Sequence, residues 1–248
     1  MLDANQAMAT AVVPAYNEAN HIQRVLDPLC SVAQLKHIIV VDDGSVDDTA
    51  VVVEAYAAQD DRVGLIRLEH NQGKGGAVMA GIQASATDVV VLLDADLINL
   101  RADHIRALMQ PVQQRQCAMT LGIFRHGRQQ TNVSHRYFYF LSGQRCLRWS
   151  AFRHTAGLRD ARWGIEMGLN LAARQQKLAV QQVPWDGVTH TMRLEKMSGL
   201  RKYWTYAEMW ADIVKFSASY SFKLWAANGR SPKWVRQFAH LPVKLSDR

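Results

Sequence analysis

Two carboxylates separated by one residue follow a strongly apolar run of the chain. The run 89–93 ends on Asp94, and Asp96 comes two residues later. A buried parallel strand is a continuous stretch of Val, Ile and Leu, and ligands of open α/β sheets bind beyond the carboxyl ends of such strands. Residues i and i+2 of an extended segment point to the same side, so both aspartates can face one crevice. Their mutual repulsion there favours Mg²⁺ or Mn²⁺ bound with a substrate phosphate, and the alternative is a solvated turn.

Two earlier loops carry side chains that suit a nucleotide. Pro14, Tyr16 and Glu18 follow the first apolar run without the G-x-G-x-x-G of a dinucleotide fold, and the ring of Tyr16 can stack on a base. Asp42 and Asp43 follow the second apolar run, and their carboxylates can accept the N–H groups of a base. These two loops predict a nucleotide site.

A third loop, residues 71–77, is rich in glycine and contains Lys74. Its spacing is not that of a Walker A loop. Backbone N–H groups at a helix start, together with one lysine, can still contact a diphosphate.

An alternating α/β framework must hold these loops. The predicted strands are residues 11–13, 38–41, 63–68, 89–93, 118–123 and 178–183, and the predicted helices are 19–31, 47–59, 73–86, 101–115 and 163–175. Alternation of strand and helix predicts right-handed crossovers and a mostly parallel sheet. Residues 132–152 are rich in Arg and aromatic side chains and give no clear element.

Composition predicts a folded cytoplasmic protein. The chain has 248 residues, 48% of them hydrophobic, with no run of 18 apolar residues and no signal-peptide pattern at its start. Cys30, Cys117 and Cys146 lack C-x-x-C spacing, which favours a reducing compartment.

Charge divides the chain into an acidic and a basic part. Residues 1–100 carry 5 Lys and Arg against 14 Asp and Glu, whereas residues 101–248 carry 24 against 8. The basic part suits an anionic second substrate or a membrane surface, and the absence of a nucleic-acid-binding motif argues against nucleic acid as a partner. Aromatic residues recur at helical spacing over 201–225, flanked by lysines, which predicts an amphipathic helix that packs on the core or lies at a membrane surface.

Four motifs in this order resemble the family 2 glycosyltransferases, which are inverting enzymes with the GT-A fold. The motifs are VVPAYNE, VVDDGSVDDT, NQGKGGAVMAG and LLDAD, between about residues 10 and 100. The resemblance implies that Asp94 and Asp96 are the D-x-D whose Mg²⁺ or Mn²⁺ bridges the donor diphosphate. It also implies a set of donor-binding residues, which are Pro14, Tyr16, Glu18, Asp42, Asp43, Lys74 and Asp94.

Within the family the chain is most similar to polyprenyl-phosphate sugar synthases, such as dolichyl-phosphate mannose synthase, and to phosphoglycerate glucosyltransferases. The synthases usually carry a metal-binding Gln two residues after the second Asp, where this chain has Ile98. His190 resembles the late His that binds the metal in several GT-A enzymes, so we expect the metal ligands Asp94, Asp96 and His190. A lone His is otherwise more often a surface or core residue.

The basic part holds the predicted acceptor site. Ser142 and Arg145 resemble the S-G-x-R segment of this subgroup, and Arg125 and Arg128 follow the fifth strand, where a guanidinium can form bidentate phosphate contacts. Glu166 resembles the acidic residue opposite the donor and is the candidate general base for a hydroxyl acceptor. A phosphate acceptor is already ionised, and Glu166 then orients a substrate or holds Arg145. A plain helix N-terminal acid is the alternative.

The sequence therefore predicts one GT-A domain over 1–248, with a mostly parallel central sheet flanked by helices. Its parts are a nucleotide-sugar half at 10–124, an acceptor half at 125–200 and a helical, basic extension at 201–248. The predicted activity is metal-dependent, inverting transfer from a UDP- or GDP-sugar to an anionic acceptor, first of all a polyprenyl phosphate, with peripheral membrane association. The alternatives are a soluble phosphorylated or hydroxyl acceptor, a sugar-nucleotide nucleotidyltransferase, and a non-catalytic nucleotide-binding relative.

Overall fold

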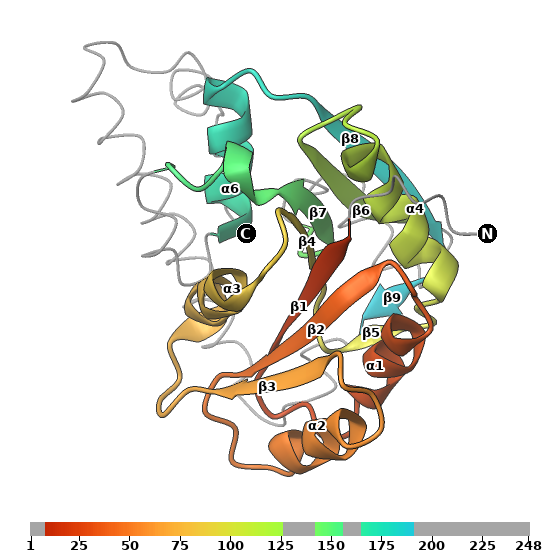
Figure 1. The fold of residues 1–248 in the computed structure, drawn as a ribbon, viewed down its shortest axis with the longest axis vertical. Coiled ribbons are helices and arrows are strands. Elements are labelled where there is room, and N and C mark those ends of the chain that lie inside the picture. Colours follow the sequence, from red (N-terminus) through yellow and green to blue (C-terminus); the bar gives the residue numbers. More distant parts are fainter. Residues whose placement is uncertain (1–7, 126–141, 156–164, 191–248) are drawn as a thin grey trace, which may run out of the picture.

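A mixed β-sheet forms the centre of the protein (Figure 1). The computed structural model describes residues 8–125, 142–155 and 165–190. Across the sheet the strands run in the order β3-β2-β1-β4-β7-β6-β8. The strands are β1 (Ala9–Ala15), β2 (Leu35–Asp42), β3 (Val63–Arg67), β4 (Val89–Leu92), β6 (Met119–Arg125), β7 (Arg145–Arg148) and β8 (Val180–Asp186). The helices are α1 (Gln23–Cys30), α2 (Thr49–Ala57), α3 (Gly73–Ala84), α4 (Ala102–Gln113) and α6 (Ile165–Gln175), with a 3₁₀ turn, η2, at Trp149–Ala151.

The first four strands confirm the predicted parallel α/β unit. β1 pairs in parallel with both β2 and β4, and β2 pairs in parallel with β3. Their carboxyl ends therefore meet at one edge of the sheet, which is where ligands of such sheets bind. The loops that begin after Ala15, Asp42 and Leu92 all lie at this edge.

Helices cover both faces of the sheet. Helices α1, α2 and α4 pack on one face, and α3 and α6 pack on the other (Figure 1). Each face of the sheet has its own cluster of buried apolar side chains. Val12 and Val13 are neighbours in β1 and are fully buried, and each belongs to a different one of these two clusters. Each such side chain contributes about 1.5–3 kcal/mol when fully buried. Burial on both faces explains why the strands are continuous apolar runs rather than alternating ones.

One central strand was not predicted. β7 lies between β4 and β6 and is antiparallel to both. Its sequence is Arg-Cys-Leu-Arg, and only Cys146 and Leu147 are apolar. Because β7 is antiparallel to β4, Leu92 pairs with Arg145, and the residues that precede β7 lie beside those that follow β4.

A separate two-stranded sheet extends the same edge. β5 (Leu97–Ile98) pairs antiparallel with β9 (Thr189–His190), and Leu97 is opposite His190. The predicted C-terminal helical extension lies outside the described residues. Within the described ranges, no helix has the length and apolar character needed to cross a membrane.

Candidate active site

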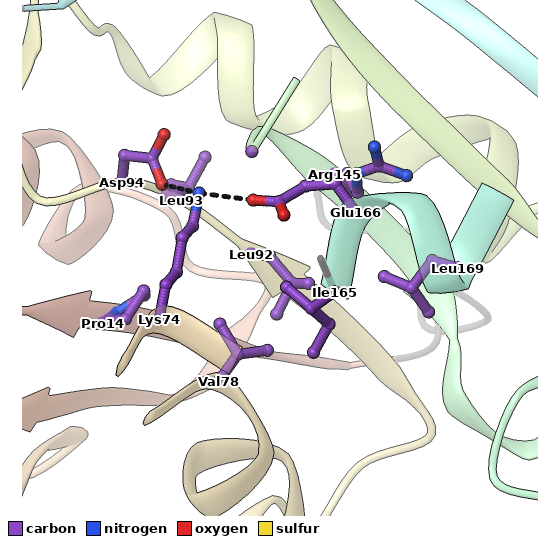
Figure 2. Close-up of a pocket in the computed structure, with 11 residues that line it drawn as sticks. Pro14, Lys74, Val78, Leu92, Leu93, Asp94, Arg145, Ile165, Glu166 and Leu169 are labelled. Atoms are coloured by element: carbon purple, nitrogen blue, oxygen red, sulfur yellow. Dashed lines mark ion pairs between the residues drawn. The ribbon is translucent and has the colours of Figure 1, made fainter. Parts of the chain in front are cut away.

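A lysine lies between two carboxylates that come from different parts of the fold (Figure 2). Lys74 Nζ is 2.6 Å from Asp94 Oδ1 and 2.7 Å from Glu166 Oε1. Lys74 is the second residue of α3, Asp94 follows the end of β4, and Glu166 is in the first turn of α6. The side chains are 20%, 28% and 9% exposed, respectively, so solvent weakens these ion pairs only in part. A residue predicted to bind the donor, a predicted metal ligand and the candidate general base thus meet in one ionic cluster.

Both sides of the closest ion pair are charged at neutral pH. Burial alone would lower the pKa of Lys74, but attraction to Asp94 and Glu166 outweighs burial and raises it. For Asp94, burial would raise the pKa, but the Lys74 ammonium, the hydrogen bond from Gln144 and attraction to His190 together lower it.

The turn before β7 completes the surroundings of Asp94. Gln144 Nε2–H donates to Asp94 Oδ2 (2.8 Å), and the Asp94 backbone N–H donates to Gln144 Oε1 (3.0 Å). Gly143 lies so close that an added Cβ would be 2.5 Å from Lys74 Nζ and 2.6 Å from Asp94 Oδ2. A side chain at position 143 is therefore incompatible with the observed ion pair.

The predicted acceptor residue Arg145 is fully buried. Its Nε–H donates to the carbonyl oxygen of Ser142 (2.7 Å), and its Nη1–H donates to Asn170 Oδ1 on α6 (2.8 Å). Burial lowers the pKa of Arg145 to about 10, against the opposing attractions of Glu166 and Asp94. Arg145 therefore ties the start of β7 to α6 and places a positive charge behind Glu166 (Figure 2).

The other predicted acceptor residues are spread more widely. The Ser142 hydroxyl is buried and donates to the carbonyl oxygen of Gly122 (2.7 Å). Arg125 ends β6 and is exposed. Arg128 lies outside the described residues.

Side chains tie together the two loops predicted to bind the nucleotide. Backbone N–H groups of one loop donate to side-chain oxygens of the other at 2.9–3.1 Å: Asn17 to Ser45 Oγ, Val46 to Asn17 Oδ1, Glu18 to Thr49 Oγ1 and Ala19 to Asp47 Oδ2. Tyr16 remains 47% exposed at this edge, as a ring that stacks on a base requires.

Asp42 and Asp43 are buried, and their carboxylates accept hydrogen bonds from backbone N–H groups. Asp43 accepts from the N–H groups of Gln72 (2.7 Å) and Gly73 (2.9 Å) and so caps the start of α3. Asp42 accepts from the N–H of Ser45 (2.9 Å). The anion at the start of α3 is thus the protein's own carboxylate, and the role of both aspartates in reading a base stays a prediction.

The three predicted metal ligands come to the same end of the sheet. The pairing of β5 with β9 sets Leu97 opposite His190. His190 is therefore near Asp96, and its ring lies 6.0 Å from that of Phe124. Two carboxylates and an imidazole form a donor set that Mn²⁺ or Mg²⁺ accepts. In the described parts of the chain, however, no three such side chains are arranged as a metal site. The positive charge beside Asp94 is the ammonium group of Lys74.

A small pocket adjoins the ionic cluster (Figure 2). Its apolar floor is formed by Val78, Leu92, Ile165 and Leu169, and Pro14 also lines it. The cluster therefore lies against apolar side chains, where charge interactions are stronger than in water.

Comparison with solved structures first defines the fold class of the protein. The fold is similar to that of glucosyl-3-phosphoglycerate synthase from Mycobacterium tuberculosis in complex with Mn²⁺, UDP and glucosyl-3-phosphoglycerate, with a TM-score of 0.65 and 22% identity. The match covers 86% of this chain and 79% of that chain. The protein thus has the predicted GT-A-like fold.

Sequence comparison then identifies the family. A dolichyl-phosphate beta-glucosyltransferase of Trichomonas vaginalis is 25% identical over 270 residues, which cover 93% of this chain and 79% of that protein. An undecaprenyl-phosphate 4-deoxy-4-formamido-L-arabinose transferase of Pseudomonas fluorescens is 41% identical over 95 residues, 36% of this chain and 27% of that protein. The model of glycosyl transferase family 2 matches residues 10–169. The chain belongs to this family and is a glycosyltransferase.

Proposed function

We propose that the protein is a metal-dependent, inverting glycosyltransferase that moves a sugar from a UDP- or GDP-sugar to a polyprenyl phosphate. The observation that carries the proposal is the position of Lys74 between Asp94 and Glu166. One cation there contacts an acid of the predicted donor site and the acid predicted to act as general base opposite the donor. Sugar transfer takes place between two such sites.

The donor half supplies binding and charge. Tyr16 offers an exposed ring for the base, and Lys74 offers an ammonium for the diphosphate. Asp94, Asp96 and His190 would hold Mg²⁺ or Mn²⁺, which neutralises the charge of the departing diphosphate when it is bound.

Glu166 has one of two roles, and the acceptor decides which. The Glu166 side-chain oxygen Oε1, which is 2.7 Å from Lys74 Nζ, can accept the proton of an attacking sugar hydroxyl. A phosphate acceptor arrives ionised and needs no base, so Glu166 then orients a substrate through Lys74, which it contacts, or holds Arg145. In both cases the acceptor oxygen attacks the anomeric carbon opposite the bond to the diphosphate, which breaks as the new bond forms.

The basic second part of the chain supports an anionic acceptor. The curated relatives named above are transferases to dolichyl and undecaprenyl phosphate, which favours a lipid phosphate and peripheral contact with a cytoplasmic membrane face. The structural neighbour holds glucosyl-3-phosphoglycerate, which favours a soluble phosphorylated acceptor as the second candidate. The division into donor half, acceptor half and C-terminal extension stays a prediction.

The test is release of nucleoside diphosphate from a panel of UDP- and GDP-sugars, with and without Mn²⁺. Each donor is combined with a short-chain polyprenyl phosphate, with 3-phosphoglycerate or with no acceptor. We expect release that depends on Mn²⁺ and rises most with the polyprenyl phosphate. A greater rise with 3-phosphoglycerate would establish the soluble acceptor instead. Folded protein that binds and turns over no donor would contradict the proposal.

A further inference from the structure

Gln144 holds the carboxylate of Asp94 in one orientation. Its side-chain amide forms two hydrogen bonds to the same residue, from Nε2–H to Asp94 Oδ2 (2.8 Å) and from the Asp94 backbone N–H to Oε1 (3.0 Å). The orientation of the amide is determined by chemistry, because an ionised carboxylate only accepts and a backbone N–H only donates. A flipped amide would lose both bonds.

Gln144 is itself fixed by its surroundings. The residue is 2% exposed, its carbonyl oxygen accepts from the N–H of Gly122 (2.8 Å), and its N–H donates to Ser142 Oγ (3.3 Å). A Cβ added at Gly122 would be 3.0 Å from the Gln144 Cβ, so the two segments are in close contact. Gln144 is therefore a rigid support.

Because Gln144 donates to Oδ2, the other oxygen of Asp94 is the one directed at Lys74. We propose that Gln144 is a positioning residue, which fixes Asp94 so that Oδ1 faces the place where the donor diphosphate and its metal bind. This inference rests on the proposed function. It adds a residue whose side chain acts through Asp94.

The first test measures donor binding. The variants are Gln144→Met, which keeps the size without the amide, and Gln144→Glu, which keeps the shape but faces Asp94 with a second carboxylate. Binding of the nucleoside diphosphate with Mn²⁺ is measured by calorimetry, and KM and kcat for the donor by diphosphate release. Loss of such supporting hydrogen bonds typically weakens metal sites about 10–100-fold. We expect a rise of about tenfold in Kd and donor KM for Gln144→Met and a larger rise for Gln144→Glu.

A matched control separates positioning from stability. Thr120 is fully buried in β6, and its hydroxyl donates to the carbonyl oxygen of Leu108 (2.6 Å), away from Asp94. Thr120→Val should lower Tm without changing Kd or donor KM. A Kd for Gln144→Met within twofold of the wild-type value, in folded protein, would overturn the proposal.

The second test needs no ligand. In the double variant Asp94→Asn with Gln144→Glu, the donor and acceptor exchange places, because the Asn amide can donate to the Glu carboxylate. We expect the double variant to recover about 2–4 °C of the Tm lost in Gln144→Glu, and additive Tm losses would overturn the proposal. If the wild type binds no donor, the proposed function fails, and this cycle still decides whether Gln144 fixes Asp94.

Discussion

Two acidic positions at the same edge of the sheet differ in what neutralises them. Asp43 follows β2 and receives two backbone N–H groups at the start of α3. Asp94 follows β4 and receives the ammonium of Lys74 and the amide of Gln144. The Asp43 bonds form part of the fold itself, whereas the ion pair of Asp94 joins it to a side chain, Lys74, that can change partners.

The difference indicates where ligand chemistry can take place. A metal can compete with Lys74 for Asp94, and a diphosphate can compete with Asp94 for Lys74, without breaking secondary structure. Competition for Asp43 would uncap α3, the helix that carries Lys74. We therefore expect substitutions near Asp94 to change activity most, and a substitution at Asp43 to act mainly on stability.

The largest effect is expected from Asp94→Ala combined with Asp96→Ala. Turnover should fall by at least about 10³-fold, because the variant lacks the two carboxylates that are proposed to hold the metal, and the metal would neutralise the leaving diphosphate. Tm should change by only a few degrees, since Lys74 keeps its ion pair with Glu166. The measurement is nucleoside diphosphate release, with the exposed Asp103→Asn as control. Activity retained in the double variant would refute the role of both aspartates.

Lys74→Met should affect both activity and stability. Asp94 and Glu166 would lose the cation between them, and the free energy of unfolding should fall by about 1–3 kcal/mol, because the site is partly exposed. Turnover should fall about 10²-fold. Urea unfolding and diphosphate release check the two effects, with exposed Lys36→Met in β2 as control. An unfolding free energy equal to that of the control would show that the ion pairs contribute nothing.

Gly143→Ala tests the close approach at the ionic cluster. The new Cβ would lie within 2.7 Å of Lys74 Nζ and both Asp94 carboxylate oxygens. The lysine must move, because Gln144 holds Asp94. We expect turnover to fall about 10–100-fold, as small misplacements in active sites do. Gly64→Ala is the matched control, since a Cβ there meets nothing within 4 Å. Equal rates for the two variants would mean that the cluster relaxes freely.

The sequence was sufficient to predict much of this arrangement. Long apolar runs are a local signal, and they located β1, β2 and β4; the last two runs also end on acids, among them Asp94. The sequence did not predict β7, because two arginines flank Cys146 and Leu147 and leave no apolar run. In addition, Arg145 is fully buried, whereas arginine is usually exposed.

Contacts between distant segments could not be predicted from local patterns. Gln144 meets Asp94 only because an antiparallel strand pairs Arg145 with Leu92. A single Gln in a loop has no periodicity, and the one available signal was its place inside the S-G-x-R segment. The predicted position of His190 near the acids likewise depends on the pairing of β9 with β5. A strand of two residues is too short to give a recognisable sequence pattern, so this pairing could not be predicted.

Asp43→Asn should give the smallest effect and sharpens the comparison with Asp94. An Asn side chain can accept from one of the two N–H groups at Gln72 and Gly73, but its NH₂ group must face the other. We expect a loss of about 1 kcal/mol in unfolding free energy, the usual value of a helix cap, with turnover reduced less than tenfold. Asp48→Asn is the control, because the side chain of Asp48, the N-cap residue of α2, forms no capping hydrogen bond. If Asp43→Asn instead abolished turnover at unchanged stability, Asp43 would contact the donor, and the contrast between the two acidic positions would be wrong.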